Sequence, residues 1–168
     1  MIQNSVVETA RLTIRPFEFA DAAGLVAILA DPQVSRFVGD GQALSGDDAA
    51  LWVTNSRANL ARYGYGTGAV IERSSGQLIG WAGFARPADG PEQIIYGLMA
   101  AHWRRGFGSE IVRALVDFAT SRAIDPVSAT VDPSNSASVA LLTKHGFRLI
   151  ERGFGGEADS DLYQRTRE

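Results

Sequence analysis

The stretch HWRRGFGSEIV, residues 102–112, decides the interpretation of this chain. It places two arginines before two spaced glycines and then begins the apolar pattern of a helix. One interpretation is a charged turn on the surface. The other is an anion site, in which backbone N–H groups and a helix N-terminus bind a phosphate. The glycine spacing and the flanking segments distinguish the two.

The glycine spacing excludes two common phosphate-binding motifs. A P-loop requires a lysine and a serine or threonine after its last glycine, and both are absent. The dinucleotide-binding fingerprint, and with it a dehydrogenase, requires a third glycine where this chain has Ile111. A loop for the diphosphate of an acyl-CoA requires a strand, a glycine-permitted turn with arginines, and a helix. Residues 92–119 supply these three parts in that order.

The composition bounds the class of protein. With 168 residues, 45% hydrophobic and 21% charged, we expect one globular domain over residues 1–168. A net charge of −3 argues against a general affinity for nucleic acid or anionic membrane. The absence of cysteine excludes disulfides, thiolate metal sites and a cysteine intermediate. Neither a signal-peptide pattern nor an apolar run of membrane-spanning length is present, which predicts a cytoplasmic protein.

The apolar periodicity predicts a mixed α/β domain with a central sheet. We expect strands at 11–17, 68–74, 77–85, 92–100, 127–131, 147–152 and 161–166, and helices at 21–30, 45–64, 109–119 and 136–145. The pair Asp31-Pro32 ends the first helix, and Gly64 ends the second. Residues 153–161, rich in glycine and acidic residues, are predicted to form a loop.

Four segments carry a resemblance to a known family: ETARLTIRPF (8–17), DPQVSRFVGD (31–40), HWRRGFGSEIV (102–112) and DPSNSASVALLTKHGF (132–147). In this order and spacing they resemble the GNAT superfamily of acyl-CoA-dependent N-acetyltransferases. Within it, the sequence is most similar to the branch of ribosomal-protein N-terminal acetyltransferases. The resemblance covers residues 8–166. It implies a GNAT-like, mostly antiparallel central sheet, with a splayed pair of strands at the CoA site and about four flanking helices.

The same resemblance implies which residues bind acetyl-CoA. The backbone of the loop that binds the diphosphate corresponds to Arg104, Arg105, Gly106, Phe107, Gly108 and Ser109. The pantetheine runs along Leu98, Met99 and Ala100, where one backbone N–H faces the thioester carbonyl. Asn135 and Ser138 match an N-x-x-S pattern that contacts CoA or its thiol end, and Phe147 packs beneath the cofactor or in the core.

The catalytic groups are less clear from the sequence. In related enzymes a carboxylate precedes the CoA loop, at a position that corresponds to Gln93 here, so Glu92 and Glu72 are the candidates for a general base. The tyrosine that often acts as the acid corresponds to Leu142, which leaves Ser138 as the candidate donor to the departing thiolate. Without cysteine, direct attack of the amine in a ternary complex is the expected mechanism.

Several other side chains have simpler interpretations. His102 flanks Trp103, and His145 lies in the last turn of a helix, where a cation is favoured. Neither has ligand-spaced partners, so no metal site is predicted. Tyr63 and Tyr65 are candidates for an acceptor groove.

The sequence therefore favours an acetyl-CoA-dependent N-acetyltransferase. The acceptor is a primary amine, either at a protein N-terminus or on a small molecule, and the sequence leaves that choice and a homodimer open. The alternative is a catalytically degenerate domain of the same fold that binds CoA as a sensor or interaction module.

Overall fold

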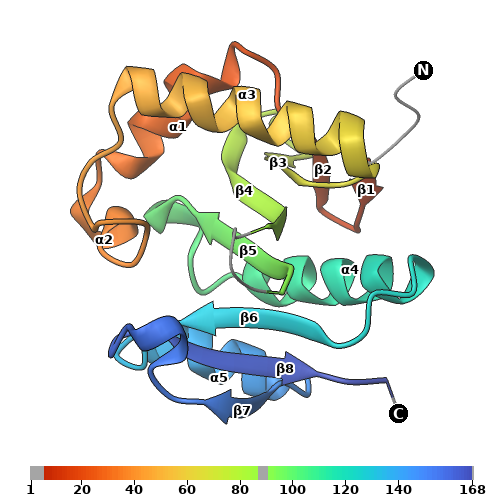
Figure 1. The fold of residues 1–168 in the computed structure, drawn as a ribbon. Coiled ribbons are helices and arrows are strands. Elements are labelled where there is room, and N and C mark those ends of the chain that lie inside the picture. Colours follow the sequence, from red (N-terminus) through yellow and green to blue (C-terminus); the bar gives the residue numbers. More distant parts are fainter. Residues whose placement is uncertain (1–5, 87–90, 168) are drawn as a thin grey trace.

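A computed structural model of the protein describes residues 6–86 and 91–167. The single domain predicted over residues 1–168 also includes residues 1–5, 87–90 and 168, which lie outside the described ranges. The chain forms one eight-stranded sheet in the order β1-β2-β3-β4-β5-β6-β8-β7 (Figure 1). The strands are β1 (Val7–Glu8), β2 (Leu12–Pro16), β3 (Thr67–Glu72), β4 (Leu78–Ala85), β5 (Gln93–Leu98), β6 (Val127–Val131), β7 (Arg148–Glu151) and β8 (Asp161–Arg165). The helices are α1 (Asp21–Leu29), α2 (Pro32–Ser35), α3 (Gly46–Tyr63), α4 (Phe107–Ser121) and α5 (Ser136–Lys144), and short 3-10 turns lie at Ala100–His102 and Phe154–Gly156.

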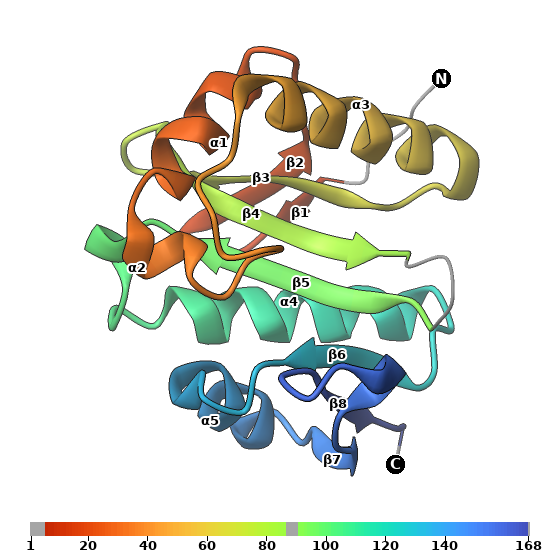
Figure 2. The same cartoon turned by 60° about the vertical axis from the view of Figure 1, so that its left-hand side comes forward.

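Helices cover both faces of the sheet (Figures 1 and 2). Side chains alternate between the two faces along a strand, and β3 shows the result. Val70 packs in the cluster that includes α4 residues such as Ile111, whereas Ala69 packs in the cluster that includes Leu25 of α1 and Val53 of α3. The sheet is therefore buried on both sides, which explains the nearly continuous apolar runs of β3 and β4.

The sheet opens between its two central strands, β5 and β6. Strand β5 pairs with β4 in antiparallel register over six residue pairs, from Gly80↔Leu98 to Ala85↔Gln93. Its parallel pairing with β6 has one registered pair, Gln93↔Ser128. Beyond that pair the two strands diverge (Figure 2). This confirms the predicted mostly antiparallel sheet with a splayed pair of strands.

Most predicted element boundaries agree with the structure. The Ser45 hydroxyl caps α3 by accepting from the N–H of Asp48, and Gly64 ends the helix with φ +81°. Two short elements were not predicted: the two-residue strand β1 and the four-residue helix α2. Asp31 explains α2, because its side chain accepts from the N–H of Gln33 and so begins a new helix directly after α1. Within the described ranges the helices therefore number five rather than four.

A helix that crosses a membrane must be long and predominantly apolar. In residues 6–86 and 91–167, none of the helices combines the necessary length with the necessary apolar character.

Candidate active site

The loop after β5 has the backbone shape of an anion site. Arg104 has φ +58° and Gly106 has φ +81°, so the chain makes two left-handed steps before α4 begins at Phe107. Gly106 is the N-cap residue and offers no side chain to cap the helix. The first N–H groups of a helix have no intrahelical partner and carry partial positive charge. The start of α4 can therefore donate several hydrogen bonds to one anionic group.

The two loop arginines have different surroundings. Arg105 is attached to the body of the protein: its carbonyl accepts from Arg11 at 2.8 Å, and its guanidinium lies 3.7 Å from Glu72 and 5.0 Å from the Phe107 ring. Arg104 is exposed and lines a cavity of about 640 Å³. Arg105 thus holds the loop in place, whereas Arg104 can bind a ligand in the cavity.

The cavity joins three regions that are distant in the sequence. One wall is β5 with the loop that follows it, the second is the start of α5, and the third is the segment around α2. Its lining residues are Gln33, Val34, Arg36, Phe37, Val38, Trp81, Tyr96, Gly97, Leu98, His102, Trp103, Arg104, Gly108, Ser134, Asn135, Ser136, Ala137, Ser138 and Leu141. Among these described lining residues, the formal charges are those of Arg36 and Arg104, and none is a carboxylate. The cavity is therefore suited to an anion.

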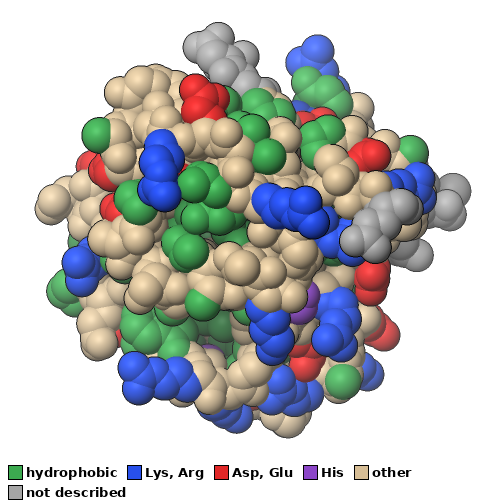
Figure 3. Space-filling view, turned by 90° about the horizontal axis from the view of Figure 1, so that it is seen from below, with side chains coloured by type: hydrophobic (Ala, Val, Ile, Leu, Met, Phe, Trp, Pro, Cys, Tyr) green, Lys and Arg blue, Asp and Glu red, His purple; other side chains and the backbone are tan. Residues whose placement is uncertain are grey.

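The face of the molecule seen in Figure 3 is mixed in charge. In Figure 3, Lys and Arg side chains are interspersed with Asp and Glu, and apolar side chains gather toward the middle of the face shown.

The open edge of β5 presents backbone groups to the cavity. Met99 donates its N–H to the carbonyl of Ile79, on the β4 side. Because successive residues of a strand direct their backbone groups to opposite sides, the N–H and carbonyl of Leu98 point toward the splayed side. The indole N–H of Trp103 occupies that carbonyl at 2.9 Å. Of the two predicted residues Leu98 and Met99, Leu98 is thus the one whose N–H faces the opening between the strands.

The start of α5 meets β5 through two hydroxyl groups. The Asn135 side chain caps the helix, since its Oδ1 accepts from the N–H of Ser138 at 3.3 Å. The Ser138 Oγ lies 2.8 Å from the phenol oxygen of Tyr96. Burial raises the pKa of the Tyr96 phenol, and the hydrogen bond with Ser138 opposes that shift only in part. The two members of the predicted N-x-x-S pattern therefore both lie on the cavity, and Tyr96 joins them.

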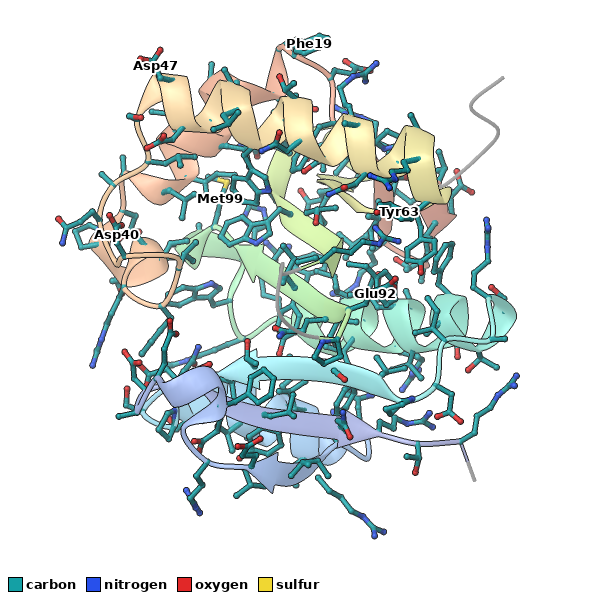
Figure 4. All side chains as sticks on the ribbon, viewed as in Figure 1. Phe19, Asp40, Asp47, Tyr63, Glu92 and Met99 are labelled. Carbon is teal, nitrogen blue, oxygen red and sulfur yellow. The ribbon has the colours of Figure 1, made fainter. Side chains whose placement is uncertain are left out.

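The two candidate bases lie outside this set of lining residues. Glu72 accepts from the Ser75 hydroxyl at 2.8 Å and lies 3.9 Å from Nε2 of His102. Glu92 accepts from the phenol of Tyr65 at 2.6 Å and from Arg86 at 3.2 Å. Figure 4 shows Glu92 near the end of β5 opposite to Met99. Their role as a base stays a prediction.

Gln93 and Leu142 are the residues that, by the family resemblance, correspond to the catalytic carboxylate and the catalytic tyrosine of related enzymes. Gln93 accepts a hydrogen bond from Thr130 of β6 at 2.7 Å, at the base of the splay. Leu142 is 1% exposed and belongs to the core, as does Phe147. That Gln93 and Leu142 correspond to the catalytic positions of related enzymes stays a prediction. Sequence reasoning overlooked Tyr96. The available signal was the alternation of β5, which puts Tyr96 two residues before Leu98 on the same face.

The histidines differ from their sequence interpretation. His102 is buried and lines the cavity, and its Nδ1 has no hydrogen-bond partner among the described residues. His145 lies 2.8 Å from the Ser109 hydroxyl. Burial and then the nearby charges of Lys144, Arg113 and Arg165 lower the pKa of His145, so the imidazole is held neutral rather than as the cation expected at a helix end. In the part of the chain that the structure describes, no three His, Asp or Glu side chains gather as a metal site would require.

The two tyrosines predicted to line an acceptor groove, Tyr63 and Tyr65, both contact other side chains of the protein. Tyr63, labelled in Figure 4, is exposed. Its ring lies 3.9 Å from the guanidinium of Arg86, and the Tyr65 ring lies 4.3 Å from the same group. The ring of the buried Trp81 packs edge to face against that of the partly buried Trp52, with ring centroids 5.6 Å apart. The tyrosines therefore form a cluster with Arg86 and Glu92 near the far end of β5.

Comparison with known proteins places this geometry in a family. A family model described as "Acetyltransferase (GNAT) domain" matches residues 11–148. The chain is 31% identical over 147 residues to the uncharacterized N-acetyltransferase YoaA of Bacillus subtilis (strain 168), covering 85% of this chain and 82% of the relative. It is 30% identical to the uncharacterized N-acetyltransferase p20 of Bacillus licheniformis, covering 83% and 80%.

Solved structures with the same fold come from several bacteria. The Agrobacterium tumefaciens acetyltransferase superimposes with a TM-score of 0.86 at 24% identity, covering 98% of this chain and 96% of that one. The Salmonella typhimurium protein yncA, solved with acetyl-CoA, gives 0.72 at 22%, covering 95% of each chain. An acetyltransferase from Salmonella typhimurium that modifies the N-terminal serine of ribosomal protein L7/L12 gives 0.80 at 16%, covering 98% and 100%.

Proposed function

The chain belongs to the GNAT acetyltransferase family, and from that premise we propose that it transfers the acetyl group of acetyl-CoA to a primary amine. The acceptor is the α-amine of a peptide N-terminus or the amine of a small molecule. One observation carries the proposal: a single cavity unites the open edge of β5, the anion-binding loop before α4 and the start of α5.

The residues around the cavity fit acetyl-CoA by charge and by hydrogen-bonding capacity. CoA carries a diphosphate, which we assign to Arg104 and the N–H groups from Gly106 to Ser109. We assign the pantetheine to the open edge at Leu98, Met99 and Ala100. The buried Nδ1 of His102, without a partner among the described residues, and the amide of Asn135 can add further hydrogen bonds.

The chemistry requires a neutral amine, a donor for the oxyanion and a proton for the leaving thiolate. We assign the oxyanion donor to the N–H of Leu98, because it points toward the splayed side of β5. We assign the proton donor to Ser138, at the start of α5. The amine attacks directly, the C–S bond breaks with its electron pair on sulfur, and the amine nitrogen loses one proton.

The acceptor follows from the cost of deprotonation. An α-amine has a pKa near 8, so a substantial fraction is neutral at physiological pH, whereas a lysine amine near 10.4 needs a strong base. Among the described lining residues no carboxylate is available to act directly. Glu72 or Glu92 can act only through intervening water or groups, which favours acceptors of low pKa. The relative of the same fold that acetylates a protein N-terminus supports the peptide α-amine.

The test combines binding and turnover. Acetyl-CoA is titrated into the purified protein by calorimetry, and thiol release is then followed with N-terminal peptides, amino acids, polyamines and amino-sugars. Arg148→Ala, an exposed arginine on β7 outside the cavity lining, is the matched control for an arginine variant at the site. Binding with amine-dependent thiol release supports the proposal. Binding without release across the panel would favour the sensor or interaction module instead.

A further inference from the structure

Tyr96 and Ser138 form a hydroxyl pair that bridges β5 and α5 at the cavity. The two oxygens are 2.8 Å apart, although the residues are separated by 42 positions in the chain. Both residues line the cavity, next to Leu98 and Asn135. Tyr96 lies two residues before Leu98 on β5, so the two side chains lie on the same face of the sheet. Leu98 is also the first residue of the segment predicted to bind the pantetheine of acetyl-CoA.

The geometry of Ser138 leaves its own proton available. A serine oxygen has one proton to donate and two lone pairs to accept with. At 2.8 Å either oxygen can donate to the other. The phenol is the more acidic partner, and the arrangement in which it donates to Oγ fills one of those lone pairs and leaves the serine proton free. A helical serine often donates to the carbonyl four residues earlier. Ser138 is the third residue of α5, so residue 134 lies outside the helix and that intrahelical acceptor is missing.

We propose that Tyr96 is the positioning residue for Ser138, and that the pair delivers a proton to the CoA sulfur as the thioester breaks. This inference rests on the proposed acetyl transfer. The Ser138 proton passes to sulfur, the Tyr96 proton replaces it on Oγ, and the proton lost by the amine nitrogen returns through solvent to the phenol. One proton thus leaves nitrogen and one arrives on sulfur, and the pair ends as it began.

The environment keeps the pair in its donating form. Burial raises the pKa of the Tyr96 phenol, so the phenol stays protonated at neutral pH. Among the described residues that line the cavity no carboxylate competes to accept from either hydroxyl, and the nearest charged lining groups are arginines. A thiolate forming in this cavity would therefore be the strongest acceptor that the two hydroxyls meet.

The experiment compares Tyr96→Phe, Ser138→Ala and the double variant with Tyr163→Phe. The control removes a phenol oxygen from a buried tyrosine of β8 that does not line the cavity. We expect Tyr96→Phe to lower kcat about tenfold, as for loss of one hydrogen bond, with the KM for acetyl-CoA within about twofold. Ser138→Ala lowers kcat about a hundredfold, the scale of a general acid. The double variant is no worse than Ser138→Ala, because Tyr96 acts through Ser138.

A second measurement does not depend on turnover. CoA is titrated into each variant by calorimetry in buffers of different ionisation enthalpy, from about pH 6 to about pH 10, a range that begins well below the reference pKa of a cysteine thiol, about 8.5, and extends above it. Donors aimed at sulfur lower the pKa of the bound thiol, so the wild type releases more protons on binding CoA than Tyr96→Phe does. Desulfo-CoA, which lacks the thiol, abolishes that difference.

The outcomes separate this inference from the proposed function. Unequal proton release without amine-dependent turnover would show that the pair donates to the CoA sulfur, but it would overturn both acetyl transfer and the delivery of a proton during it. Normal turnover with equal proton release and an unchanged kcat in Tyr96→Phe refutes the pair and leaves acetyl transfer standing. Failure of the wild type to bind CoA refutes both.

Discussion

Replacement of Arg104 by glycine tests whether Arg104 binds the ligand while Arg105 holds the loop in place. Arg104 lines the cavity and has φ +58°, whereas Arg105 is bound to Arg11 and Glu72. A hydrogen bond to a charged group contributes about 1.5–3 kcal/mol, and we take the lower end because Arg104 is exposed. At about 1.4 kcal/mol per tenfold, the dissociation constant for acetyl-CoA should rise about tenfold.

The same substitution should leave the fold intact. A left-handed backbone costs a non-glycine residue about 1–2 kcal/mol, which glycine relieves. Glycine also raises the entropy of the unfolded chain, at a cost of about 0.5–1 kcal/mol. The free energy of unfolding should therefore change by no more than about 1 kcal/mol, or about 2–4 °C in Tm. Arg104→Gly thus weakens binding without unfolding the loop.

Calorimetric titration of acetyl-CoA, with a thermal melt of each variant, is the assay. Arg104→Lys keeps the charge and should retain most of the affinity, and the effect of Arg104→Gly should shrink as salt screens the contact. Arg105→Ala, whose guanidinium is directed to Glu72, should change the dissociation constant by less than Arg104→Gly does. A dissociation constant for Arg104→Gly within twofold of the wild type would refute the assignment of the diphosphate to this side of the loop.

Three further predictions concern the helix ends and the titrating groups. Asn135→Ala removes the cap of α5, so it should lower the free energy of unfolding by about 1 kcal/mol and also weaken acetyl-CoA binding. Asn135→Ser keeps a capping side chain and should weaken binding alone. Thermal melts measure the first effect and calorimetric titrations the second. Burial opposes ionisation of Asp21, but Arg15 and the N–H of Glu18 together outweigh it and lower the pKa of the carboxyl below 3.8. The stability that this carboxylate adds is therefore present above about pH 4 and lost as pH falls below it, and denaturant unfolding of Asp21→Asn should lack that acid-dependent loss. Burial and the nearby cations hold the pKa of His145 below 6.5, so the stability linked to its neutral form is full above that pH and declines as pH falls. The Tm of His145→Gln should lose this slope with pH, and a slope equal to that of the wild type would exclude His145 as its source.

The fold was predictable where local signals agree. Residues close together in the sequence determine three features that the structure contains. These are the strand–loop–helix order around Gly106, the caps at Ser45 and Gly64, and the apolar runs of the central strands. Helix α2 was missed because four residues show no periodicity, although the Asp31 cap was in the sequence. Local signals thus set most elements but not the shortest ones.

The candidate site was predictable in part. The glycines and Asn135 follow from sequence motifs, but the approach of α5 to β5 does not, and this approach brings Tyr96 to Ser138. In the same way, the positions of Glu72 beside His102 and of Glu92 beside Tyr65 depend on tertiary packing. Identifying the base therefore requires kinetics as well as a motif.

The most direct test of the central claim is the stoichiometry of a single reaction. The wild-type protein is mixed with acetyl-CoA and an N-terminal peptide or small amine that responds in the panel, and free CoA and the acceptor's mass are measured together. The account predicts one acetylated amine for each CoA released, with release that depends on the acceptor and falls in Ser138→Ala. Tight binding of acetyl-CoA with no acetylated amine, or CoA release that ignores the acceptor, would contradict it.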